Sequence, residues 1–192
     1  MSFILKPYQK KGVKELVKRK YLVLTDEMGI GKTGQALKAV EALYKKGLIV
    51  IIIPAYLKPK WEEEITNWTP KLKEKIIIIS YTSLKKLPSL VGSKKVTHII
   101  FDEADNLKNE HALKTTYAMA LCNQTKPISI FFLSGTIVRN RFRDVFVPFS
   151  ICANFLAMEQ KDLVKKKPKC KKTSTKALKL SLIHISEPTR PY

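Results

Sequence analysis

The chain has 192 residues, of which 45% are hydrophobic, so it is long enough to bury a core and has an ordinary globular composition. Its 36 basic residues exceed its 16 acidic residues and give a formal net charge of +20, which suits a polyanionic partner. Residues 1–150 carry 26 basic and 13 acidic residues, or +13, and residues 161–180 carry nine lysines and one aspartate, or +8. Lysine used only for solubility is an alternative explanation of the charge, so charge alone does not decide for nucleic acid.

The same inspection excludes several classes of protein. No apolar run reaches the roughly 18 residues that a membrane span requires, and the N-terminal residues lack the apolar region and cleavage site of a secretory signal. The three cysteines, Cys122, Cys152 and Cys170, are far apart and odd in number, which favours a reduced setting and argues against a zinc site. We therefore expect an intracellular protein, cytoplasmic or nucleoid-associated, with no membrane partner.

The spacing of apolar residues predicts helices and strands that alternate along most of the chain. The first helix, with a basic face, is expected over residues 6–20, and the first strand over residues 21–25. Further helices are predicted over residues 34–46, 59–68, 81–87 and 112–122, and further strands over residues 48–53, 76–79, 96–101 and 128–133. Because the strands are too apolar for an exposed sheet, the pattern predicts an α/β fold with a parallel sheet covered by helices on both faces.

Polar clusters follow four of these strands, at residues 26–33, 54–60, 102–105 and 134–136. Ligands of parallel α/β sheets bind at the carboxyl ends of the strands. We therefore expect the four clusters to form a single active face.

The first cluster is the glycine turn DEMGIGKT, residues 26–33. Gly29 and Gly31 allow backbone N–H groups to surround phosphate oxygens, and the following helix presents its positive end to the same anion. Lys32 can reach the β and γ phosphates, and the Thr33 hydroxyl can hold Mg²⁺. The strict phosphate-loop pattern has glycine where this turn begins with aspartate, so the match to the general motif is imperfect.

The third cluster is an acidic pair at the end of a predicted strand. Asp102 can bind Mg²⁺, and Glu103 can orient or deprotonate an attacking water. A phosphate cradle followed about 70 residues later by a strand-end Asp-Glu pair is what MgATP hydrolysis needs. The residues Ser134, Gly135 and Thr136 can relay nucleotide state from the next strand end, although such a tripeptide is also an ordinary loop.

In this order the motifs resemble the first motor domain of superfamily-two helicases, and within it the Swi/Snf-type translocases of double-stranded DNA. The resemblance covers about residues 4–150. This group uses aspartate in place of the first glycine, and its carboxylates are followed by the Leu-Lys-Asn found here at residues 107–109. Asp105 stands where the group usually has histidine, and Ile137 where it usually has proline. The matching segments are LKPYQKKGV (5–13), DEMGIGKT (26–33), IIIPAYLKPKWEEEI (51–65), IISYTSL (78–84), DEADNLKN (102–109) and LSGTIVRNR (133–141).

The resemblance implies a RecA-like P-loop NTPase that uses ATP and Mg²⁺. It implies that Gln9 reads the adenine edge and that residues 134–136 are the coupling motif. The catalytic residues would be Lys32, Asp102 and Glu103, and the metal would be held by Thr33 and Asp102. The nucleotide-binding set would be Gln9, Met28, Gly29, Ile30, Gly31, Lys32 and Thr33.

For contact with double-stranded DNA we favour residues 55–61 and the loop after Ile79, because they share the sheet end with the nucleotide. Lys58 and Lys60 can meet phosphates, whereas Trp61 is expected to anchor the core and not to stack on bases. No feature supports base readout, and the family likeness suggests tracking of the DNA backbone.

Residues 1–150 are expected to form an N-terminal RecA-like ATP-binding helicase domain, followed by a basic, partly disordered tail over residues 151–180. Residues 181–192 resemble a translated sequencing-adapter scar. The motor of this family has a second RecA-like domain, which supplies arginines to the ATP site. No second RecA-like domain is predicted in this sequence. We therefore expect the missing domain to be a partner of this chain, and ATP hydrolysis by this chain alone to be very slow. A DEAD-box-like RNA helicase fragment and a binding module without turnover are the alternatives.

Overall fold

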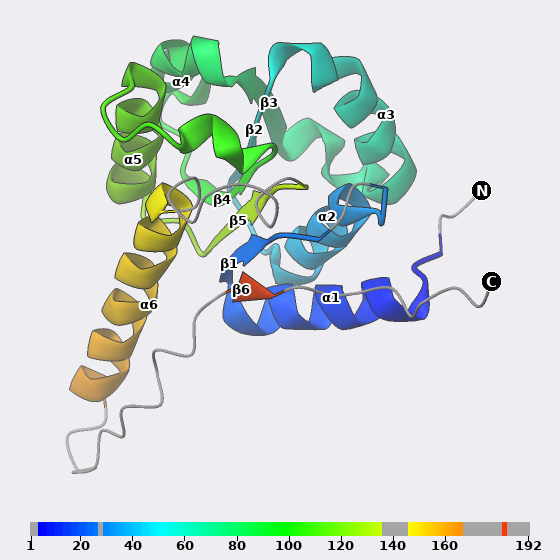
Figure 1. Ribbon diagram of the computed structural model, residues 1–192, viewed down its shortest axis with the longest axis horizontal. Coiled ribbons are helices and arrows are strands. Elements are labelled where there is room, and N and C mark those ends of the chain that lie inside the picture. The colour runs from blue at the N-terminus through cyan, green and yellow to red at the C-terminus, as the bar shows by residue number, and fades with distance from the viewer. Residues whose placement is uncertain (1–3, 27–28, 136–145, 167–181, 184–192) are drawn as a thin grey trace.

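The computed structural model describes residues 4–26, 29–135, 146–166 and 182–183. It contains a parallel sheet in the order β3-β2-β4-β5-β1-β6 (Figure 1). The predicted α/β fold with a parallel sheet is therefore confirmed. The strands are β1 (Tyr21–Leu24), β2 (Leu48–Ile53), β3 (Ile76–Ser80), β4 (Val96–Phe101), β5 (Ser129–Leu133) and β6 (Leu182–Ile183).

The helices follow the predicted order with small shifts at their ends. The predicted helix over residues 81–87 is instead a 3-10 turn that leads into a short α-helix, because Pro88 lacks an N–H and is suited to the start of a new helix. No helix in the described part of the chain is long and apolar enough to cross a membrane. The α-helices are α1 (Pro7–Arg19), α2 (Lys32–Leu43), α3 (Lys58–Trp68), α4 (Leu87–Val91), α5 (Leu113–Thr125) and α6 (Phe146–Lys166), and the 3-10 helices are η1 (Ala55–Leu57), η2 (Pro70–Lys75), η3 (Tyr81–Lys86) and η4 (Ala104–Leu107).

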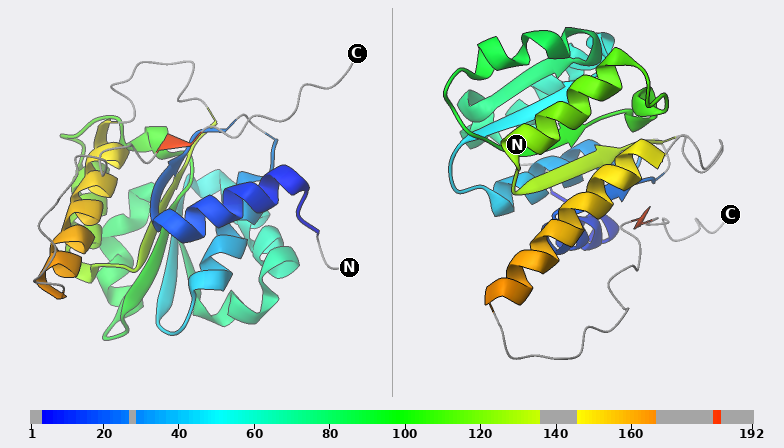
Figure 2. Two further views of the ribbon diagram at one scale, coloured as in Figure 1. Left: turned by 90° about the horizontal axis from the view of Figure 1, so that it is seen from below. Right: turned by 90° about the vertical axis from the view of Figure 1, so that its left-hand side faces the viewer.

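Helices cover both faces of the sheet, and alternate strand residues serve the two faces. In β2, Ile49, Ile51 and Ile53 pack in the cluster that contains α1, α2 and α3, whereas Val50 and Ile52 pack in the cluster that contains α4, α5 and α6. Figure 2 shows the sheet between these two layers of helices. All six residues of β2 are buried, which explains why its sequence is apolar throughout.

Helix α6 corrects the expected domain boundary at residue 150. The helix runs through that position, and Ile151, Cys152 and Phe155 are buried in the core. The rings of Phe155 and Tyr21 lie 5.3 Å apart between centroids, so α6 packs directly on β1. The folded unit therefore extends beyond residue 150, because these apolar residues form a stripe on α6 that faces the core.

The remaining basic tail, residues 167–180, lies outside the described residues, as do residues 181 and 184–192. Residues 182–183 pair in parallel with β1 as strand β6. This pairing does not test the origin of residues 181–192, which stays a prediction.

Candidate active site

Residues from three of the four predicted polar clusters, those after β1, β2 and β4, border one cleft of about 360 Å³. The cluster after β5 is not among the described residues that line this cleft, so its part in the active face stays a prediction. The turn after β1 and the start of α2 supply Gly29 and residues 31–34, and the end of β4 supplies Asp102 and Glu103. Helix α3 forms the remaining wall. Its contributing side chains are Lys60, Trp61, Glu64 and Trp68.

The glycine turn has the backbone conformation that a phosphate cradle requires. Gly29 has φ 86° and Gly31 has φ 79°, both in the left-handed region that favours glycine. Helix α2 begins at Lys32, immediately after Gly31, so its first unpaired N–H groups lie at the cleft. The described part of the turn can therefore bind an anion through its backbone.

Lys32 holds the glycine turn through a hydrogen bond to its first residue. Its Nζ donates to the backbone oxygen of Asp26 over 2.7 Å. Burial lowers the pKa of Lys32, and the charges of Asp26, Asp102 and Glu103 oppose that shift. A partly desolvated ammonium at the cleft is well placed to meet phosphate oxygens.

The acidic pair is held by several hydrogen bonds. The Asp102 carboxylate accepts the indole N–H of Trp61 through Oδ2 at 2.8 Å and the Glu103 backbone N–H through Oδ1 at 3.0 Å. Tyr81 donates its hydroxyl to the Asp102 carbonyl at 2.8 Å. Glu103 has φ 48°, a left-handed conformation that is uncommon for a non-glycine residue and occurs often at functional sites.

The two carboxylates are destabilised in their charged forms. Burial raises the pKa of Asp102, while the hydrogen bond from Trp61, the Glu103 N–H and the charges of Lys32 and Lys60 oppose the shift. Burial also raises the pKa of Glu103, and the charges of Asp102 and Asp105 add to the shift. A bound cation would relieve this cost.

The donor set fits Mg²⁺ held together with a nucleotide. The Thr33 hydroxyl and the Asp102 carboxylate border the same cleft, and both are oxygen ligands that Mg²⁺ prefers. Among the described residues there is no cluster of three or more His, Cys, Asp or Glu that could hold a metal by itself.

Gln9 lies beside the glycine turn with its side chain engaged by the protein. Its Nε2 donates to the Ile30 carbonyl at 3.0 Å, and its Oε1 accepts the Lys6 backbone N–H at 2.8 Å. Gln9 is only 7% exposed. The structure thus gives Gln9 a role in holding the turn to α1, while the contact with adenine stays a prediction.

The other predicted residues are placed less completely. Ile30 is buried, so the nucleotide-facing part of that residue would be its backbone. Ser134 is buried at the end of β5, and its N–H donates to the Leu24 carbonyl at 3.0 Å, beside the start of the glycine turn. Gly135 follows it, whereas Met28 and Thr136 lie outside the described residues.

The two lysines predicted to contact nucleic acid face different hollows. Lys60 borders the nucleotide cleft, whereas Lys58 borders a neighbouring hollow that also contains Ser80 and Ser83. Residues two apart on a helix point in nearly opposite directions, which separates the pair. Lys58 forms an exposed pair with Glu62 at 3.9 Å.

Sequence reasoning missed the cleft-facing role of α3. Trp61 is 1% exposed, which confirms it as a core anchor, but it also donates to Asp102. Trp68 donates in the same way to Glu64 at 2.7 Å. The sequence gives one general reason to expect such a contact, which is that a buried indole N–H needs a hydrogen-bond acceptor.

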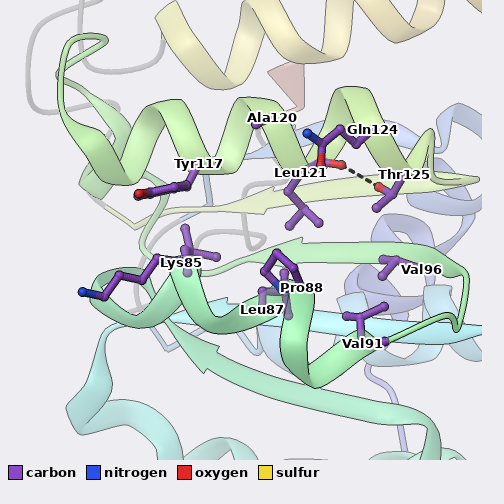
Figure 3. Close-up of a pocket in the computed structure, with 12 residues that line it drawn as sticks. Lys85, Leu87, Pro88, Val91, Val96, Tyr117, Ala120, Leu121, Gln124 and Thr125 are labelled. Atoms are coloured by element: carbon purple, nitrogen blue, oxygen red, sulfur yellow. Dashed lines mark hydrogen bonds between the residues drawn. The ribbon is translucent and has the colours of Figure 1, made fainter.

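A second hollow lies on the opposite face of the sheet, between α4 and α5 (Figure 3). Its walls include Leu87, Val91 and Leu121, with Tyr117 at one end. Lys85 is the one charged residue on its wall among the described residues, and no carboxylate lies there. This apolar hollow lacks the groups for phosphate chemistry, so the cleft at the strand ends is the better candidate.

The fold and the cleft define a nucleotide-binding domain of the RecA-like P-loop class. Residues 8–77 match the SNF2-related domain family. Together with the relatives described below, this match shows that the chain is similar to SNF2-related proteins named as ATP-dependent helicases.

Two relatives illustrate the match. An uncharacterized ATP-dependent helicase of Mycoplasma genitalium is 31% identical over 79% of this chain and 17% of its own length. A SWI/SNF-related regulator of chromatin, subfamily A-like protein 1, of Drosophila melanogaster is 30% identical over 74% of this chain and 21% of its own. The chain thus spans about a fifth of the length of such relatives.

A solved structure shares the fold. The SWI2/SNF2 ATPase core of Sulfolobus solfataricus, determined in complex with double-stranded DNA, matches with a TM-score of 0.68 and 20% identity. The match covers 96% of this chain and 45% of that chain. At this identity the likeness shows the RecA-like fold alone.

Proposed function

We propose that this chain is the ATP-binding half of a DNA-dependent ATPase that translocates on double-stranded DNA. The observation that carries the proposal is the single cleft that joins the glycine turn, Lys32 and Thr33 to the Asp102–Glu103 pair. The similarity to proteins named as ATP-dependent helicases supports ATP use.

Each protein group has a distinct part in the proposed hydrolysis. Backbone N–H groups of the turn and Lys32 bind the phosphates, and Thr33 and Asp102 hold Mg²⁺. When bound, Mg²⁺ neutralises charge that develops on the phosphate oxygens. Glu103 orients the attacking water and accepts its proton, because its carboxylate borders the cleft and burial raises its pKa above the ordinary value, which makes it a stronger base.

We further propose that residues 1–192 alone hydrolyse ATP slowly. The described residues that border the cleft include the cations Lys32 and Lys60 but no arginine. An arginine supplied to a phosphoryl-transfer site accelerates the reaction by about 10³ to 10⁵. In the proposed motor a second RecA-like domain supplies that arginine.

The proposed DNA surface is the exposed rim beside the cleft, at residues 55–60 and after β3. Lys58 is 59% exposed at its side chain, and Ser80 and Ser83 share its hollow. Lysine and hydroxyl groups bind phosphates without reading sequence. A DNA-bound structural neighbour supports the choice of duplex DNA over RNA.

Nucleotide binding tests the site directly. Lys32→Ala is expected to weaken ATP binding at least tenfold with an unchanged far-ultraviolet circular dichroism spectrum, because phosphate would lose a charged partner. Lys45→Ala is the matched control, since Lys45 is an exposed lysine between α2 and β2, at the opposite end of the sheet. Unchanged ATP affinity in the Lys32 variant would refute the site.

ATPase assays separate the proposal from its alternatives. Double-stranded DNA, single-stranded DNA and RNA are added in separate reactions, and duplex DNA is expected to stimulate most. Stimulation only by RNA would favour the RNA helicase alternative. ATP binding with no turnover under any condition would favour the non-catalytic binding module.

A further inference from the structure

A buried tryptophan of α3 donates a hydrogen bond to the carboxylate that we assign as a Mg²⁺ ligand. Trp61 donates its indole N–H to Asp102 Oδ2 at 2.8 Å, although the two residues are 41 positions apart. We propose that Trp61 is a positioning residue that fixes the Asp102 carboxylate in the orientation needed to receive Mg²⁺ with ATP. This inference rests on the proposed function.

The hydrogen bonds around Asp102 assign distinct tasks to its neighbours. The carboxylate torsion of aspartate has a broad energy minimum, so hydrogen bonds decide the plane of the two oxygens. Oδ1 is held by the Glu103 N–H at 3.0 Å, and Oδ2 is held by Trp61. Tyr81 holds the Asp102 carbonyl and thus the backbone, which leaves the indole to orient Oδ2.

The indole itself is rigidly placed. Trp61 is 1% exposed and belongs to the core cluster that contains Ile65 of the same helix and Ile53 at the end of β2. A donor fixed by packing holds its acceptor within a narrow range of angles. Groups that orient a metal ligand typically change metal affinity by about 10- to 100-fold when they are removed.

Helix α3 offers a matched control for a purely structural role. Trp68 lies two turns beyond Trp61, is 8% exposed and donates its indole N–H to the Glu64 carboxylate at 2.7 Å. Both tryptophans border the cleft. Trp61→Phe and Trp68→Phe therefore remove the same donor from the same helix, but only one of them releases Asp102.

The test measures binding of a fluorescent ATP analogue with Mg²⁺ and with EDTA. The ratio of the two dissociation constants isolates the metal, because a general effect on the cleft appears in both. Trp61→Phe is expected to reduce the Mg²⁺-dependent gain in affinity by about tenfold. Trp68→Phe is expected to keep the wild-type gain, and Asp102→Asn to abolish it.

A double variant tests whether Trp61 acts through Asp102. In the Asp102→Asn background, adding Trp61→Phe should leave the Mg²⁺/EDTA ratio unchanged, since the oriented group is already gone. An unchanged ratio in the single Trp61→Phe variant, or an equal loss in Trp68→Phe, would overturn the inference. If the wild-type chain shows no Mg²⁺-dependent ATP binding, the proposed function itself fails, which is a distinguishable outcome.

An NMR measurement on the wild-type protein tests the same contact without depending on whether the Trp61→Phe variant folds. The chain contains two tryptophans, so a ¹⁵N-tryptophan-labelled sample gives two indole N–H resonances. Adding Mg²⁺ to the nucleotide-bound protein is expected to shift the Trp61 resonance, and Asp102→Asn to shift the same one. A response confined to Trp68, or none at all, would contradict the assignment.

Discussion

At the scale of single residues, the cleft concentrates charges that are costly without a ligand. Burial lowers the pKa of Lys32 and raises that of Asp102 and Glu103, so each group is disfavoured in its charged form. Phosphate and Mg²⁺ supply the opposite charges. The arrangement is typical of a binding site that trades stability for function.

The two glycines of the turn give a residue-scale prediction. A Cβ on Gly31 would clash with Gln9 Nε2, whereas a Cβ on Gly29 would meet no atom of the described residues within 4 Å, and both glycines have positive φ. Gly29→Ala should therefore cost only backbone strain, about 1–2 kcal/mol. Gly31→Ala should cost a further 1–3 kcal/mol or so for overpacking, measured by urea unfolding.

The control for this pair is Gln9 itself. In a Gln9→Ala background the steric part of the Gly31→Ala cost should largely disappear, because the clashing amide is gone. Two results together would show that the Gln9 amide does not pack against Gly31. The losses of unfolding free energy in Gly29→Ala and Gly31→Ala would be equal, and the effects of Gly31→Ala and Gln9→Ala would simply add in the double variant.

At the scale of elements, strand β4 carries a buried histidine away from the cleft. His98 Nδ1 lies 2.8 Å from Ser129 Oγ on β5, and the ring of Tyr44 lies 6.1 Å away between centroids. Burial lowers the pKa of His98 from 6.5 to about 4. The imidazole is therefore neutral in the folded protein at pH 7.

His98 should make stability fall in acid. Between pH 6.5 and about 4 the unfolded chain binds a proton that folded His98 does not, so the free energy of unfolding decreases as pH falls. The loss attributable to His98 should reach about 3 kcal/mol by pH 4. Urea unfolding across this range should show a smaller loss for His98→Gln. His111→Gln, a change at an exposed side chain, is the control substitution.

Helix α6 gives a second prediction at this scale. Phe155 is 5% exposed and packs on Tyr21, so Phe155→Ala should cost about 3 kcal/mol and lower Tm by roughly 6–12 °C. Met158, on the same helix, is 50% exposed, and Met158→Ala should change Tm little. Equal melting of Phe155→Ala and the wild type would show that α6 does not belong to the cooperative unit.

At the scale of the whole molecule, the excess of positive charge predicts salt-dependent binding to duplex DNA. The logarithm of the binding constant should fall linearly with the logarithm of salt concentration. Lys58→Ala should reduce the slope by about one, because Lys58 is proposed to contact one phosphate. Lys45→Ala should leave the slope unchanged. The same reduction in both variants would mean that charge acts diffusely and not through the proposed surface.

Much of the molecule could be predicted from local patterns. The phosphate turn at residues 26–33 and the Asp102–Glu103 pair are identified by residue type and spacing alone, and the structure brings their described parts into one cleft. The boundary at residue 150 was wrong because lysines that follow in the sequence obscured the apolar stripe of α6. That Lys58 and Lys60 border different hollows could not be predicted from the sequence, and their contact with nucleic acid stays a prediction.

The sequence by itself determined the order of the elements and the chemistry at the strand ends, because hydrophobic period and motif spacing are local properties. Only the tertiary structure decided that Trp61 meets Asp102 and that Gln9 holds the Ile30 carbonyl. The physical reason is the order of the strands, in which β2 lies beside β4 and β1 beside β5. That order brings distant strand ends together, and chain position does not reveal which neighbours result.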